Sequence, residues 1–276
     1  MTTSSPWHFQ IQANSKPNGF LLGDLSLFWK IKEGDWIVGT RRDAAAAEGS
    51  GFKFLSEPEP EGVDWRRLAS VDEIPRIQLQ PAFPNRPVVV RPEFPYTLVP
   101  GERVNIFVGV PVWLSLTTPQ GLLLWEEPVH RLSNTWFGTP TDGELCYAMR
   151  TLARREGENL DFGPERIICP VRIRNQTKEI ISFERLCLRV QYLNIYETSR
   201  KGLWANESSV MMRGDVTGSR VAFASKAPAM LKDAKLLVQG KEDARGTFSI
   251  SVSGPSPKER GGFNDRVLYT ALLAYL

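Results

Sequence analysis

The sequence predicts a mostly β protein built from sandwich-like sheets, and three observations support this fold class. Apolar and polar residues alternate in short runs, as they do in half-buried strands. Proline and glycine turns separate runs of about five residues, a spacing typical of antiparallel sandwiches. The eight tryptophans supply large apolar side chains for the cores of such sheets. We expect either two Ig-like β domains or one bilobal β protein, with a short C-terminal helix.

The composition is that of an ordinary globular protein. Hydrophobic residues make up 42% and charged residues 24% of the chain, which argues against disorder along its whole length. The net charge of +3 is too small to indicate a general nucleic-acid binder. No apolar stretch reaches the length of a membrane helix and the start lacks the features of a secretory signal. We therefore expect no transmembrane segment and a cytoplasmic location.

The N-terminal part, residues 1–80, contains one clear hairpin. Residues 20–32 alternate as a strand should, residues 33–35 favour a turn, and residues 36–39 continue as a second strand. Residues 43–64 are rich in alanine, glycine and proline without a period, which predicts a mobile connection. This part either forms a β segment by itself or packs with the C-terminal part.

Six prolines fall between Pro81 and Pro100 and flank the β-branched triplet Val88-Val89-Val90. Each proline removes a backbone donor and fixes φ, so the spacing argues against a helix or a central strand. It favours polyproline structure or an edge strand, and we place a domain boundary here. The segment is either a proline-rich ligand for a partner or, as the apolar residues between the prolines favour, a rigid strand entering a sandwich.

The strongest strand pattern lies in residues 85–200, where we predict an Ig-like sandwich. Residues 145–152 fit either a strand or a helix. Residues 201–276 are expected to form a C-terminal β region with weaker strand signals. Its last segment, Asp265–Leu276, has apolar residues at helical spacing after a plausible N-cap at Asn264, which predicts a terminal helix.

Two sequence blocks resemble a known family. WFGTPTDGELCYAMRTLARR at Trp136–Arg155 and CPVRIRNQTKEIISFERLCLRV at Cys169–Val190 are similar to signature blocks of the DUF432 family. The proline block at Pro84–Glu102 and the hairpin around Trp29 and Trp36 also fit its bacterial members. The resemblance covers most of the chain. It implies a prokaryotic, soluble, β-rich protein, and it brings no assigned activity and no catalytic residues.

The first candidate site is a loop whose proposed binding residues are Trp136, Phe137, Thr139, Asp142 and Glu144. Glycine and proline between them permit a tight turn that would hold the two carboxylates near an aromatic wall, as sugar binding or two-carboxylate hydrolysis requires. The alternative is a hairpin turn capped by Asp142, with the two aromatic side chains anchored in the core.

The second candidate site is an anion-binding face formed by Arg172, Arg174, Arg185 and Arg189. Each arginine alternates with apolar residues in a predicted strand, so pairing of these strands would gather four guanidinium groups on one face. The alternative is a solvated strand face with acidic neighbours such as Glu184.

Several chemistries are disfavoured. The chain has only two histidines, His8 and His130, which argues against a catalytic zinc or iron site. No cysteine-hydrolase motif surrounds Cys146, and no phosphate-cradling motif is present. The three cysteines fit free, buried thiols better than a disulfide framework. We therefore expect no cofactor, no metal and no catalytic residues.

The preferred hypothesis is a non-catalytic binding or scaffold protein that uses the loop or the arginine face. Its partner would be a protein or a small anionic or sugar ligand, not nucleic acid, and a homodimer is one form of self-association. The alternative is a carbohydrate-active hydrolase whose acid and base come from Asp142, Glu144, Glu126 and Glu127. Such an enzyme needs two carboxylates about 5 to 10 Å apart in a concave site.

Overall fold

The computed structural model describes an all-β protein whose only described helices are two 3₁₀ helices, η1 (Pro6–His8) and η2 (Val190–Tyr192). Neither described helix is long and apolar enough to cross a membrane. The described residues are 6–12, 18–42, 51–57, 60–69, 74–138, 140–141, 143–151, 153–155, 160, 162–199, 202–213, 219–242, 248–252 and 271–272.

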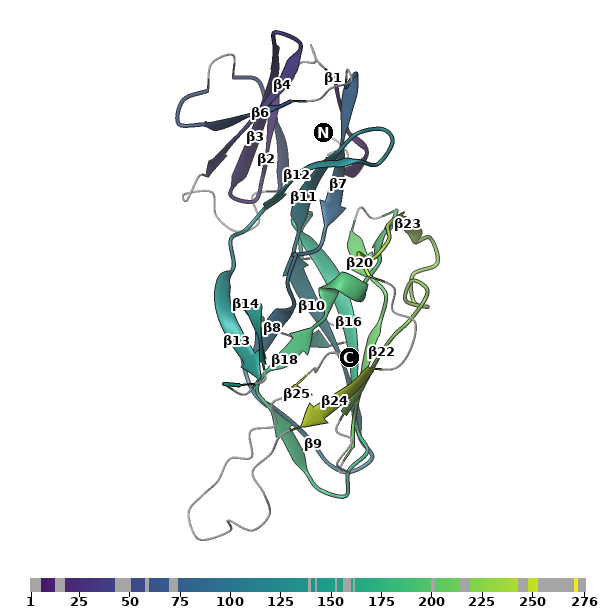
Figure 1. Ribbon diagram of the computed structural model, residues 1–276. Helices are drawn as coiled ribbons and strands as arrows, with labels where there is room; N and C mark the ends of the chain where they lie inside the picture. The colour runs from purple at the N-terminus through teal and green to yellow at the C-terminus, as the bar shows by residue number, and fades with distance from the viewer. Residues whose placement is uncertain are drawn as a thin grey trace.

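The described strands form five sheets along an elongated molecule, with one sheet of five strands at the N-terminal end (Figure 1). This sheet has the order β5 (Phe52–Leu55), β2 (Gly19–Leu22), β3 (Leu25–Lys32), β4 (Asp35–Arg42), β6 (Asp64–Leu68). A four-stranded sheet follows in the order β1 (Gln10–Gln12), β7 (Arg76–Ala82), β11 (Trp113–Thr117), β12 (Leu123–Pro128).

The remaining sheets make up the other half of the molecule (Figure 1). A second four-stranded sheet has the order β13 (Ser133–Gly138), β14 (Gly143–Thr151), β8 (Val88–Pro92), β18 (Leu186–Leu188). A pair is formed by β17 (Ile181–Phe183) and β9 (Tyr96–Leu98). The largest sheet has the order β23 (Lys235–Val238), β19 (Ile195–Glu197), β20 (Leu203–Ala205), β16 (Arg166–Asn175), β21 (Ser208–Met212), β22 (Ser219–Phe223), β24 (Phe248–Val252), β25 (Ala271–Leu272), with β10 (Arg103–Pro111) and β15 (Arg154–Arg155) attached through β10.

The N-terminal hairpin is confirmed, and the segment after it differs in part from the prediction. Glu33 and Gly34 both have positive φ, 56° and 87°, as a two-residue hairpin turn between β3 and β4 requires. Residues 52–55 form strand β5, which pairs with β2. The sequence pattern missed this short strand, in which no side chain is fully buried. Its Phe52 ring lies 5.6 Å from the ring of Phe20.

The prediction that the proline block excludes a central strand is wrong. β8 lies in the interior of its sheet, parallel to β14 on one edge and antiparallel to β18 on the other. Its two bounding prolines, Pro87 and Pro92, leave the donors of Val88, Val89, Val90 and Arg91 intact, so both edges can pair. The segment thus forms a central strand of its sheet.

Sheets join parts of the chain that the sequence pattern separates. β7 from residues 1–80 pairs with β11 from residues 85–200, and β16 pairs with β20 and β21 from the last part. Residues 143–151 are strand β14, which resolves the ambiguity between strand and helix. Only Ala271 and Leu272 of the predicted terminal helix are described, and these two residues form β25; the rest lies outside the described residues.

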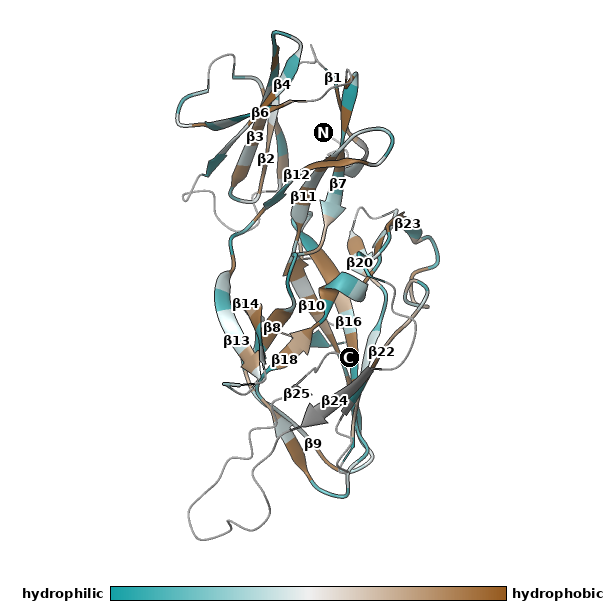
Figure 2. Cartoon of the chain, viewed as in Figure 1, coloured by the Kyte–Doolittle hydropathy of each residue, from teal (hydrophilic) through white to brown (hydrophobic). Residues whose placement is uncertain are grey.

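The main core runs through both halves of the described structure. Hydrophobic residues, drawn in brown in Figure 2, concentrate in β8, β10, β16 and β18, and the core cluster draws on these strands and on the N-terminal sheet. Trp29 and Trp36 are buried in this cluster, as expected for large apolar side chains. Cys146, Cys169 and Cys187 are buried and free, which confirms the prediction from their number and spacing.

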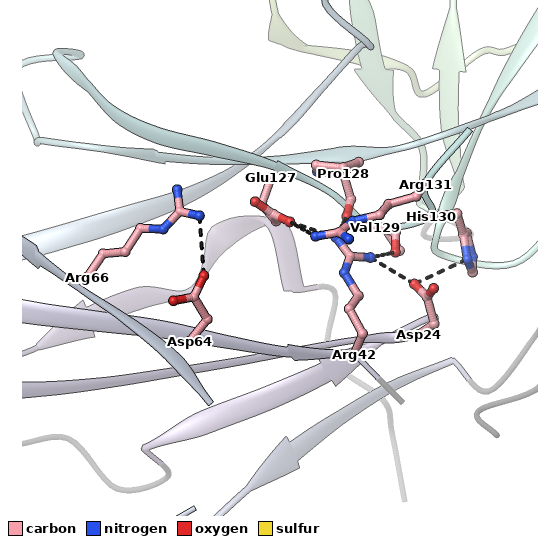
Figure 3. Close-up of polar contacts among 9 residues, drawn as sticks. All are labelled: Asp24, Arg42, Asp64, Arg66, Glu127, Pro128, Val129, His130 and Arg131. Carbon is pink, nitrogen blue, oxygen red and sulfur yellow. Dashed lines mark hydrogen bonds and ion pairs between the residues drawn. The ribbon is translucent and has the colours of Figure 1, made fainter. Parts of the chain in front are cut away.

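Arg42 of the N-terminal sheet contacts the last two residues of β12 and the residue that follows them (Figure 3). One guanidinium nitrogen donates to Asp24 Oδ1 at 3.0 Å and to the Val129 carbonyl at 2.6 Å. The other donates to Glu127 Oε1 at 2.8 Å and to the Pro128 carbonyl. The side chains of Arg42 and Glu127 are only 20% and 12% exposed, so the pair is held largely away from water.

Replacing Arg42 with methionine is expected to lower the free energy of unfolding by about 3 kcal/mol, because the buried charge of Glu127 would lose its partner at 2.8 Å and keep only the exposed Arg131 at 3.7 Å. The matched control is Arg66→Met, which breaks an ion pair with Asp64 whose side chains are 54% and 71% exposed. That change should cost less than about 1 kcal/mol. Urea unfolding of both variants measures the difference, and equal losses would contradict the role of Arg42.

Candidate functional site

The sheet formed by β13, β14, β8 and β18 has two chemically different faces. Side chains alternate across a strand, and register partners share a face. Val88, Val90, Met149, Leu186 and Leu188 belong to the main core. The opposite face, here called the second face, includes Phe137, Glu144, Cys146, Ala148, Arg150, Val89, Arg91 and Cys187. Continuing the alternation of β18 by one residue at each end adds Arg185 and Arg189.

One row of the second face consists of three arginines. Arg150 of β14 is the register partner of Arg91 of β8. On the other edge of β8, Leu186 is paired with Val90, and continuing this antiparallel register by one residue places Arg185 opposite Arg91. The row Arg150–Arg91–Arg185 therefore runs from β14 across β8 to the residue that precedes β18, with like charges as neighbours.

The three arginines line one cavity. Its volume is about 760 Å³, and its walls also include Pro92, Pro95, Thr151, Glu93 and Glu184. Among the described residues, no carboxylate forms an ion pair with Arg91, Arg150 or Arg185. Three cationic and two anionic side chains leave a formal excess of one positive charge in the lining. A second cavity of about 430 Å³ shares Pro92 and Pro95 with the first.

A buried ion pair lies at the other end of the second face. Arg189, at the start of η2, directs both terminal nitrogens to the carboxylate of Glu144, with Nη1 3.2 Å from Oε2 and Nη2 bonded to Oε1. The side chain of Arg189 is 5% exposed and that of Glu144 is 24% exposed. Because Glu144 is in β14, the pair ties the two strands that flank β8.

A small apolar cluster lies beside this ion pair on the second face. It consists of Val89, Phe137, Cys146 and Cys187, all buried. The Cys146 thiol donates to the Glu144 carbonyl at 3.7 Å. A side-chain hydrogen bond with Cys146 and burial raise the pKa of the Cys187 thiol well above its ordinary value. Burial also raises the pKa of the Glu144 carboxyl, and the nearby Arg189 opposes that rise.

The predicted binding loop is a hairpin between β13 and β14, and the structure separates its residues. Phe137 is buried in the small apolar cluster, whereas Trp136 is 47% exposed. The Trp136 indole lies across Gly143, where an added Cβ would come within 2.5 Å of Nε1. Glu144 points to Arg189. Thr139 and Asp142 lie outside the described residues.

The four arginines of the predicted anion-binding face do not lie together. Arg172 and Arg174 are on β16 in the largest sheet, and Arg172 bonds Glu207 Oε2 at 2.9 Å. Arg185 lines the 760 Å³ cavity, and Arg189 is buried against Glu144. The predicted alternation of Arg185, Cys187 and Arg189 with Leu186 and Leu188 is present, but β18 pairs with β8 instead of β16.

The carboxylates named for hydrolysis are each engaged elsewhere in the described structure. Glu126 accepts from Ser115 Oγ at 2.9 Å and from Lys241 Nζ at 2.8 Å. Glu127 is bound by Arg42, and Glu144 by Arg189. Both glutamates of β12 belong to a different sheet from Glu144, and none of the three lines either described cavity.

Arg91 and Arg150 were missed by reading the sequence. Arg91 directly follows the valine triplet. If the triplet had been predicted as a strand, the alternation of side chains would have placed Arg91 on the face opposite Val90. Arg150 falls in the segment that fits both a strand and a helix. Their meeting depends on a parallel pairing between segments about 60 residues apart, which no local pattern encodes.

Comparison with known proteins identifies the family without adding a ligand. No curated protein and no solved structure matches the chain. A family model described as a protein of unknown function (DUF432) matches residues 7–251. The match includes β1 to β23 and β24 up to its last residue, and it ends before β25. The resemblance of the two sequence blocks is therefore confirmed, and the chain belongs to the DUF432 family.

Proposed function

We propose that this protein is a non-catalytic binding protein that takes a small anionic ligand in the cavity lined by Arg91, Arg150 and Arg185. The observation that supports this function is the row of three arginines on adjacent strands, with no ion-pair partner among the described residues. Guanidinium groups donate in pairs to phosphate or carboxylate oxygens, so a row of them suits an anion with several acceptors.

The row is unfavourable without a ligand. Like charges directly opposite each other on paired strands destabilise a sheet. Alternating charge avoids this cost where Lys32 pairs with Asp35 between β3 and β4, whereas Arg103 and Arg174 form another like-charge pair, between β10 and β16. An anion shared by Arg150, Arg91 and Arg185 would convert the repulsion into attraction, which supports a binding role for the row.

The cavity has the size of a small-molecule site. Its volume of about 760 Å³ lies within the usual range for such sites, about 300 to 1,000 Å³. Pro92 and Pro95 stiffen one wall because each fixes its own φ. Glu93 and Glu184 restrict the ligand further, because an anion bearing hydroxyl or amino donors would satisfy these carboxylates while its acidic group meets the arginines.

Replacing Arg91 with glutamine is expected to weaken binding of inorganic phosphate by about tenfold or more, because one charge-assisted contact is lost from the centre of the row. Isothermal titration with phosphate, pyrophosphate and citrate measures the affinities. The matched control is Arg174→Gln, an exposed arginine on a different sheet that lines neither cavity. Equal affinities for wild type and Arg91→Gln would rule out the site.

The same Arg91→Gln change should stabilise the ligand-free protein. It removes like-charge repulsion with both neighbours, so the free energy of unfolding is expected to rise by about 0.5 kcal/mol. The gain should shrink as salt is raised, since exposed charges are screened. Urea unfolding in phosphate-free buffer at low and high ionic strength tests this. A loss of stability would mean that Arg91 serves the fold and not a ligand.

A further inference from the structure

Two thiols and a carboxylate meet on the second face, at the end away from the arginine row. The Sγ atoms of Cys146 and Cys187 and a carboxylate oxygen of Glu144 all lie within 4.8 Å of one another. Both cysteines are buried, whereas the partly exposed side chain of Glu144 borders solvent. The three donors therefore form a compact group with one open side.

A disulfide does not account for this thiol pair. Cys146 is on β14 and Cys187 on β18, and these strands pair with opposite edges of β8. Their backbones are thus two interstrand spacings apart, about 9.6 Å, whereas a disulfide needs Cα atoms within about 7 Å. A single ion between the sulfur atoms can bridge the two strands without moving them.

Charge balance favours a divalent ion. Without metal, the charges of Glu144 and Arg189 cancel, and a thiol that carries its proton adds no charge. A divalent ion that displaces one proton from each thiol brings two positive charges and leaves two thiolates, so the net charge stays zero. A monovalent ion that displaced both protons would leave one uncompensated negative charge in a buried cluster, which is costly, so only a divalent ion can bind both thiolates at zero net charge.

The donor set and its support suit a borderline-soft metal. Thiolates select ions of the zinc class over Mg²⁺ and Ca²⁺. Tetrahedral zinc, with Zn–S distances of about 2.3 Å, places two thiolates about 3.8 Å apart, so donors already within 4.8 Å need only small shifts. Arg189 holds both oxygens of Glu144, and each oxygen retains a lone pair for the metal. Such outer contacts commonly orient metal ligands.

We propose that Cys146, Cys187 and Glu144 bind a divalent metal ion of the zinc class, with Arg189 as the positioning residue for Glu144. Binding of one ion releases two protons, one from each thiol. Three protein donors leave a fourth position for a water molecule or another ligand. The site revises the expectation that the cysteines are only small core residues, and it uses none of the three cavity arginines.

Cadmium titration of the EDTA-treated full chain tests the site, because cadmium–thiolate bonds absorb in the ultraviolet. Wild type should bind one equivalent with a charge-transfer band, and a large excess of zinc should reduce this band by competition. Cys146→Ser and Cys187→Ser should each lose most of this band. The matched control, Cys169→Ser, removes a buried cysteine that lies outside the cluster and should keep the full band.

Two further variants keep the test decisive if a cysteine variant fails to fold. Glu144→Gln should weaken cadmium affinity by about tenfold or more with both thiols intact. Arg91→Gln should bind cadmium like wild type, so the metal site and the anion site can fail separately. Absence of the charge-transfer band in folded wild type, or an unchanged band in folded Cys146→Ser and Cys187→Ser, would overturn the proposal.

Discussion

The register that β8 keeps with β14 on one edge and β18 on the other determines which polar side chains of this protein meet. One residue of slippage in a strand exchanges its two faces. In the observed register, Val88 and Val90 enter the main core, and Val89 and Arg91 are left on the second face. The buried valines thus fix the position of the arginine, because moving Arg91 inward would expose two core residues and bury a charge.

The second face carries two chemistries at its two ends. The arginine row leaves positive charge without a carboxylate partner among the described residues, whereas Glu144 and Arg189 neutralise each other beside the thiols of Cys146 and Cys187. Both groups draw on β14 and on the β18 segment, with β8 between them. Ligands at either end would therefore connect the same two strands, and each would add stability only to the native register.

Local patterns predicted many of the strands, although not β5 or the central position of β8, and they did not predict which strands pair. The alternation in residues 185–189 correctly separated the arginines from the leucines, because side-chain period is a local property. The expected pairing with β16 was wrong because Arg172 and Arg174 show the same alternation as residues 185–189, and this local pattern does not identify the strand that each segment pairs with. The number of prolines wrongly predicted that β8 could not be a central strand. The prolines lie at the ends of the strand, where they leave the backbone donors between them able to pair.

The most direct test of the shared row is a double-mutant cycle on phosphate affinity with Arg150→Gln, Arg185→Gln and the combined variant. These two arginines lie on strands that do not pair with each other and that share β8 as a neighbour. If both hold one anion across Arg91, their effects are coupled, and the double variant loses clearly less affinity than the sum of the single losses. Additive losses, or affinities unchanged from wild type, would contradict a common anion site on this face.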